Sequence, residues 1–150
     1  MKQKAEFLHY FRQNNVNFSR FYTRILFQAN LTLPQYTLLN QLAAEGTMPM
    51  TDASEKLHIS KPAVTHLVDR LEKNKFLERI SHLKDRRIYL LEIQPKGKKI
   101  VRQIQSCIFR YLLKVLDQFN EQDRKTIVKF HALIAHTMDQ FLNNSRKVRV

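Results

Sequence analysis

The sequence predicts a mostly α-helical protein that carries one small β-hairpin. Only two glycines and four prolines interrupt its 150 residues, and the stretches between them repeat apolar residues at helical spacing. Two short segments rich in β-type residues, 76–81 and 88–93, flank the polar, cationic stretch 84–87. Apolar residues make up 43% of the chain, which is enough to build a core.

The first predicted elements are three helices. Apolar residues recur at helical spacing from about residue 4 to residue 30 and indicate one long helix. Thr32 or Leu33, followed by Pro34, is typical of the start of a second helix, which Gly46 ends. Thr51 is a suitable N-cap for a short third helix over 51–57.

A fourth helix, beginning after the N-cap Ser60, has one apolar and one polar face. Its apolar face carries Val64, Leu67, Val68 and Leu71, so the opposite face is centred on Pro62, His66, Asp69 and Lys73, with Thr65 and Arg70 beside it. A short helix, this helix and a cationic hairpin together predict a winged helix-turn-helix. In that fold the helix lies in a DNA major groove and the hairpin, called the wing, reaches the neighbouring minor groove.

Helices also follow the hairpin. Pro95 and Gly97 precede a strongly helical region, and Asn120, with acidic residues after it, caps a last helix. The apolar stripes of these helices and of the N-terminal helix are too broad for a small central module to cover. We therefore expect a homodimer whose terminal helices bury one another.

Charge and composition narrow the function. The 26 Lys and Arg against 13 Asp and Glu give a net charge of +13, which favours a polyanionic partner such as double-stranded DNA. We find no glycine-rich phosphate loop, nucleophile motif or metal-ligand spacing, so we expect no enzyme activity, no cofactor and no metal site. The single cysteine, Cys107, and the lack of a membrane-spanning segment suggest a cytoplasmic protein without membrane attachment.

The ordered motifs resemble the multiple antibiotic resistance regulator (MarR) family of transcription factors. The segments that carry the resemblance are 59–73, 77–79, 85–87 and 95–97. It implies one MarR-like domain over 1–150, with dimerisation helices over 1–30 and 98–145 and a DNA-binding lobe over 34–95. It also implies a repressor that binds a pseudo-palindromic operator and leaves it when an effector binds.

The same resemblance, with the free helix face and the hairpin tip, gives the expected DNA-binding residues. They are Ser60, Lys61, Pro62, Thr65, His66, Arg70, Lys73, Lys84, Asp85, Arg86 and Arg87. In the family the Asp of the wing orients an Arg that enters the minor groove, a role that falls on Asp85 and Arg87. His66 stands where many members carry Arg, so the usual contact with guanine does not carry over.

One departure from the family pattern and two open alternatives remain. Asn74 replaces the usual Gly after the reading helix, and we expect it to adopt the left-handed conformation that a helix end requires. The aromatic residues Phe18, Phe21, Tyr22 and Tyr36 either line an effector pocket or pack in the core or dimer interface. The basic surface also fits an adaptor that binds nucleic acid or an anionic surface without sequence preference.

Overall fold

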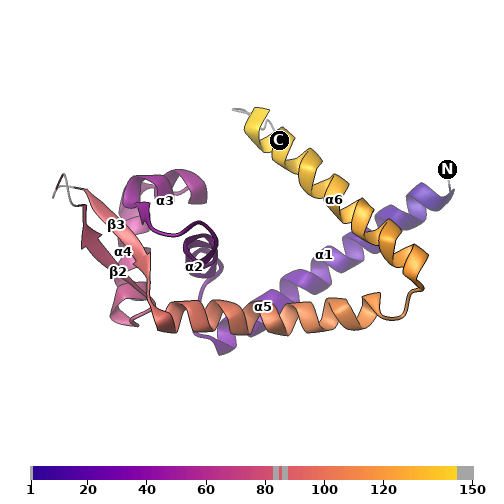
Figure 1. Cartoon of the computed structure of the whole chain (residues 1–150), viewed down its shortest axis with the longest axis horizontal. Coiled ribbons are helices and arrows are strands. Elements are labelled where there is room, and N and C mark those ends of the chain that lie inside the picture. The colour runs from indigo at the N-terminus through magenta and orange to yellow at the C-terminus, as the bar shows by residue number, and fades with distance from the viewer. Residues whose placement is uncertain (1, 83–84, 86–87, 145–150) are drawn as a thin grey trace. The chain divides into compact units, whose positions relative to one another are not determined.

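The computed structural model describes residues 2–82, 85 and 88–144. Its elements, in chain order, are α1 (Lys2–Gln28), α2 (Leu33–Glu45), β1 (Met48–Pro49), α3 (Met50–Leu57), α4 (Lys61–Lys73), β2 (Leu77–Ser81), β3 (Tyr89–Ile93), α5 (Pro95–Leu116) and α6 (Glu121–Asn144) (Figure 1). The predicted fold class, mostly α with a small hairpin, is confirmed. The chain forms two compact units, residues 1–106 and 107–150, and α5 runs from the first into the second.

In the first unit, the turn from α1 into α2 is fixed by local hydrogen bonds. The Thr32 backbone N–H donates to Gln35 Oε1 at 2.9 Å, and the Gln35 N–H donates to Thr32 Oγ1 at 3.5 Å. This capping box satisfies two amides that the first turn of a helix leaves without partners. Helix α2 therefore begins at the predicted place, and it ends at Gly46, whose φ of 88° suits glycine.

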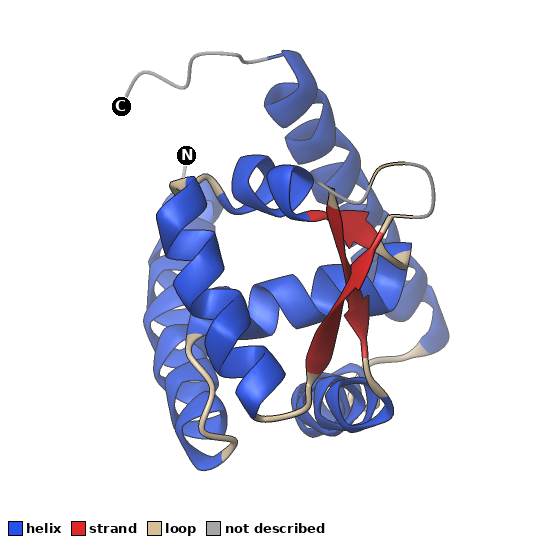
Figure 2. Ribbon diagram, turned by 90° about the vertical axis from the view of Figure 1, so that its left-hand side faces the viewer, coloured by secondary structure: helices blue, strands red, loops and turns tan. Residues whose placement is uncertain are grey.

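The three strands form an antiparallel sheet in which β3 lies between β1 and β2 (Figure 2). Leu77 pairs with Ile93 and Ser81 with Tyr89, so the predicted hairpin is present. Strand β1 was not predicted: it pairs Met48 with Leu91 and contains Pro49. Two residues, one of them a proline, are too few to show a strand pattern in the sequence. They form a strand only because they pair with the edge of β3 that β2 does not occupy.

The first residue of α3 differs from the sequence prediction. Pro49, in an extended conformation, holds the N-cap position without a side-chain hydrogen bond, and the helix begins at Met50. Thr51 instead donates from its hydroxyl to Asp52 Oδ1 at 3.1 Å. The prediction of Thr51 as N-cap was wrong because pairing in β1 keeps Pro49 extended up to the start of the helix.

A continuous apolar core connects these elements in the first unit. The largest fully buried side chains come from α2, α4, the hairpin and the first half of α5: Leu38, Leu39, Leu42, Val64, Val68, Leu71, Leu77, Leu91 and Val101. Burial of a Leu or Val side chain contributes about 1.5–3 kcal/mol, so this core fixes the orientation of α4 against the sheet.

Gly97 allows α5 to start close to the hairpin. A Cβ atom at this position would lie 2.1 Å from the carbonyl oxygen of Phe76 and 2.8 Å from Ile93 Cγ1. The Gln94 N–H donates to that same carbonyl at 2.9 Å. Only glycine leaves room for this approach of two backbones.

The second unit consists of the end of α5, a turn and α6. Arg124 closes the turn, since its Nε donates to the Leu116 and Phe119 carbonyls at 3.1 and 2.8 Å and its Nη2 to the Asp117 carbonyl at 2.9 Å. Asn120 caps α6 as predicted, accepting from the Asp123 N–H at 2.9 Å. In the described part of the chain, every helix is too short or too polar to cross a lipid bilayer.

Candidate nucleic-acid interface

Helix α4 begins with a well-formed cap at the expected residue. Ser60 is extended and its Oγ accepts from the Ala63 N–H at 3.4 Å, while Pro62 lies in the first turn, where a proline has no amide to lose. His58, with φ of 51°, reverses the chain between α3 and α4. These local features produce the helix-turn-helix pair.

The predicted reading face of α4 is exposed. Val64, Leu67, Val68 and Leu71 are buried, as predicted, and the face opposite them is open to solvent. That open face brings together the expected contacts Ser60, Lys61, Pro62, Thr65, His66, Arg70 and Lys73. Thr65 uses its hydroxyl to donate to the Lys61 carbonyl at 3.1 Å, so its methyl group is the part left for apolar contact.

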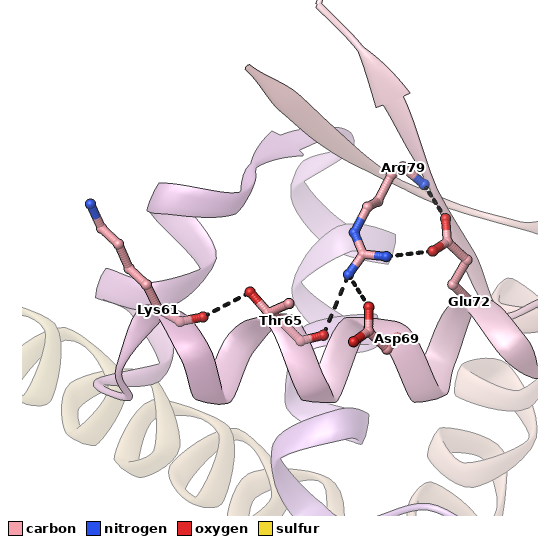
Figure 3. Close-up of polar contacts among 5 residues, drawn as sticks. All are labelled: Lys61, Thr65, Asp69, Glu72 and Arg79. Atoms are coloured by element: carbon pink, nitrogen blue, oxygen red, sulfur yellow. Dashed lines mark hydrogen bonds and ion pairs between the residues drawn. The ribbon is translucent and has the colours of Figure 1, made fainter. Parts of the chain in front are cut away.

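Arg79 of β2 forms an ion-pair cluster with α4 that we call the Arg79 cluster (Figure 3). Its Nη1 donates to Glu72 Oε2 at 2.5 Å, and its Nη2 donates to Asp69 Oδ1 at 2.5 Å and to the Thr65 carbonyl at 3.4 Å. The Arg79 backbone N–H also donates to Glu72 Oε1 at 2.9 Å. One side chain thus joins the strand to two turns of the reading helix.

The Arg79 cluster has an electrostatic consequence for the reading face. Asp69 lies on that face with its side chain 52% exposed, and a carboxylate there would repel DNA phosphates. The guanidinium of Arg79, 20% exposed, faces both Asp69 and Glu72 and offsets much of their charge. The Arg79 guanidinium is therefore directed to these two carboxylates of α4.

Sequence reasoning placed Arg79 in a motif but gave it no role. Its acidic partners are 7 and 10 residues away in sequence, and they meet it only when β2 folds back along α4. A basic residue in a strand that follows a helix with acidic residues is a weak sequence signal for an ion pair between them. It becomes usable only when the register of the hairpin is known.

The end of α4 corrects one expectation. Asn74 has φ of −85°, and Lys75, with φ of 59°, takes the left-handed conformation. The Phe76 N–H donates to the Leu71 carbonyl at 2.9 Å and the Lys75 N–H to the Glu72 carbonyl at 2.8 Å. This pattern places the left-handed residue after the C-cap, and Asn74 instead donates from Nδ2 to the Arg70 carbonyl at 2.8 Å.

The wing is described only at its base. The His82 N–H donates to the Ile88 carbonyl and the Ile88 N–H to the Asp85 carbonyl, both at 3.0 Å, so Asp85 lies where the hairpin turns. Lys84, Arg86 and Arg87 lie outside the described residues.

The candidate effector residues are only partly brought together. The rings of Tyr22 and Tyr36 are 6.4 Å apart, and burial raises the pKa of the Tyr36 phenol, with a smaller contribution from Tyr22. Phe21 is half-buried and Phe18 is 39% exposed. The described residues contain no cluster of three or more potential metal ligands.

Comparison with known proteins agrees with this geometry. Residues 31–89 match the MarR family. The chain is 28% identical over 114 residues to the uncharacterized HTH-type transcriptional regulator YsmB of Bacillus subtilis (strain 168), covering 76% of this chain and 78% of the relative.

Solved structures show the same fold. A MarR family protein from Bacillus stearothermophilus matches with a TM-score of 0.77 at 24% identity, covering 94% of this chain and 96% of that one. A mutant of MepR from S. aureus bound to oligodeoxyribonucleotide matches with a TM-score of 0.69 at 19% identity, covering 88% and 97%. Residues 31–89 therefore form a MarR family winged-helix domain, and over 76% of its length the chain is similar to an HTH-type transcriptional regulator, a class of DNA-binding proteins and not of enzymes.

Proposed function

We propose that the protein is a sequence-specific repressor that binds a pseudo-palindromic operator as a homodimer and leaves it when an effector binds. The observation that supports this most is the exposed reading face of α4, which the Arg79 cluster holds beside the hairpin. Residues Lys61, Thr65 and His66 then meet base edges, while cationic side chains meet phosphates. Two-fold symmetry sets the half-sites about 10 bp apart or at a multiple of that spacing.

The apolar surface of the terminal helices supports a homodimer. On α1 and α6 large apolar side chains are exposed in the single chain, among them Phe7, Leu8, Phe11, Val16, Leu133, Met138 and Phe141. Apolar area on this scale is covered by a partner in stable proteins, and the economical partner is a second copy. Deletion of residues 1–25 should leave a monomer or an aggregate in light scattering, and a soluble, well-folded dimer would contradict this assembly.

The wing contributes to binding through Arg87, oriented by Asp85, the two roles that the family motif implies. A narrow minor groove concentrates negative potential and so favours an arginine. Arg87→Ala should weaken operator binding at least about tenfold. Lys147→Ala, which removes a charge from the basic C-terminal segment, should mainly reduce the salt dependence. Equal, small effects of the two changes would contradict the wing assignment.

The proposed effector site lies at the junction of α1 and α2. We place it beside Phe18, Phe21, Tyr22 and Tyr36, because the rings of Tyr22 and Tyr36 lie 6.4 Å apart, tilted by 49°, where α1 meets α2. A compound that releases operator DNA from the wild type and not from Tyr22→Ala would support this location. Release that is unaffected by the substitution would exclude it.

A gel-shift titration tests the main proposal. The purified protein is titrated onto its own upstream intergenic DNA at near-physiological salt, in the presence of excess scrambled competitor of equal length. A discrete shifted band that survives the competitor is expected. A smear that any polyanion abolishes would favour the alternative, an adaptor that binds nucleic acid or an anionic surface without sequence preference.

A further inference from the structure

A cationic cavity lies beside the reading helix, where α1 ends and α2 begins. It has a volume of about 320 Å³, and its lining includes Phe27, Asn30, Thr32, Arg70, Lys73 and Asn74. The last turn of α4 and the α1–α2 turn thus form one surface, which we call the corner cavity. It belongs neither to the helix-turn-helix turn nor to the hairpin.

The charge of the corner cavity is positive and uncompensated. Its lining contains the cations Arg70 and Lys73 and no carboxylate. Both side chains are exposed, and within the described residues neither forms an ion pair. The nearby acidic side chains of α4, Asp69 and Glu72, are already paired with Arg79. Two adjacent cations without counter-charges attract an oxyanion.

The position of the cavity along α4 indicates which oxyanion it meets. At 1.5 Å per residue, Arg70 and Lys73 lie about 6 and 10 Å beyond His66 along the helix axis. The major groove is about 12 Å wide, so a helix whose first turns lie among the bases meets the sugar-phosphate backbone with its last turn.

Phe27 adds an apolar wall to the cavity. It is the last aromatic residue of α1 and is 82% exposed, so it contributes almost nothing to the core. An aromatic ring beside two cations fits a nucleotide of the backbone, which offers an apolar sugar face next to its phosphate. The combination is better suited to DNA than to a bare inorganic anion.

We propose that the corner cavity holds the DNA backbone: Arg70 and Lys73 bind a phosphate at the edge of the half-site, and Phe27 packs against the adjoining deoxyribose. The end of α1 is then a third DNA-contacting element, besides α4 and the wing. Arg70 acts on the backbone and not on a base. This inference rests on the proposed function, because it assumes that α4 lies in a major groove.

Fluorescence anisotropy on the operator fragment and on scrambled DNA, over a series of salt concentrations, tests the inference. The variants of the full-length protein are Lys73→Gln and Phe27→Ala. Lys129→Gln removes the same charge from α6, and Leu33→Ala truncates an exposed residue next to the cavity that does not line it.

Lys73→Gln should weaken binding to both DNAs alike. It should reduce the slope of log affinity against log salt by about 2, because each subunit of a dimer loses one phosphate contact worth about 0.9. Phe27→Ala should weaken binding about three- to tenfold without changing the slope, and both controls should resemble the wild type. An unchanged slope in Lys73→Gln, or equal effects of Phe27→Ala and Leu33→Ala, would overturn the inference.

Two further results distinguish failure of the proposed function from failure of the backbone contact. If the wild type does not prefer the operator, the proposed function fails, while the slope change on scrambled DNA still decides the backbone contact. Inorganic phosphate is compared with chloride at equal ionic strength. Stronger competition by phosphate in the wild type, and not in Lys73→Gln, would reassign the cavity to a free anion.

Discussion

Replacing Arg79 with Met should destabilise the protein by about 2 kcal/mol. Met keeps most of the apolar stem and removes the guanidinium, which donates to Glu72, to Asp69 and to the Thr65 carbonyl. Hydrogen bonds to charged groups contribute about 1.5–3 kcal/mol each. The carboxylates of Asp69 and Glu72 are 52% and 37% exposed, so solvent screening reduces the sum. Their mutual repulsion, three residues apart on one helix, adds a few tenths.

The assay is urea denaturation and thermal unfolding at one fixed protein concentration, because the stability of a dimer depends on concentration. About 2 kcal/mol corresponds to a decrease in Tm of about 4–8 °C for a chain of this size. Arg79→Lys should recover only part of the loss, since an ammonium group cannot face both carboxylates in the fork geometry of a guanidinium.

A double-mutant cycle isolates the interaction. Arg79→Met combined with Glu72→Gln should give a coupling energy of about 1 kcal/mol or more. The matched reference is the exposed pair of Lys56 and Glu45, which should give about 0.5 kcal/mol or less. If the two coupling energies are equal, the reasoning about the Arg79 cluster is refuted.

Three other outcomes follow from single positions. Gly97→Ala should lower the free energy of unfolding by about 2–3 kcal/mol in urea denaturation, because its Cβ would meet the Phe76 carbonyl 2.1 Å away; a neutral effect would show that α5 can shift. Lys75→Gly should raise the free energy of unfolding by about 0.5–1 kcal/mol, since φ at this residue is 59°, while Lys75→Ala should not raise it. Burial raises the pKa of Tyr36 above 10.0, so the folded protein keeps a phenolic proton that the unfolded chain loses, and this contribution to stability declines as pH rises above about 10. Titration of tyrosinate absorbance should show one late step that Tyr36→Phe removes, and a persisting late step would contradict the assignment.

The sequence by itself determined the helices and the reading face. Spacing alone separates the buried side of α4, with Val64 and Leu71, from its exposed side, because helical periodicity is a local property. Caps are local too, so a few neighbouring residues were enough to place Ser60 and to narrow the cap of α2 to Thr32 or Leu33, of which the structure has Thr32. The family motifs then connected these elements to DNA.

Only the tertiary structure decided the features that depend on residues far apart in sequence. Strand β1 exists because Met48 meets Leu91, and α3 therefore starts one residue before the expected cap. Arg79 acquires its role from a hairpin that folds back along α4, and the corner cavity joins the end of α1 to residues about 40 positions later. Local patterns specify which face of an element is polar. Which polar groups meet is set by packing, since the shared core fixes the register and orientation of each element against the next.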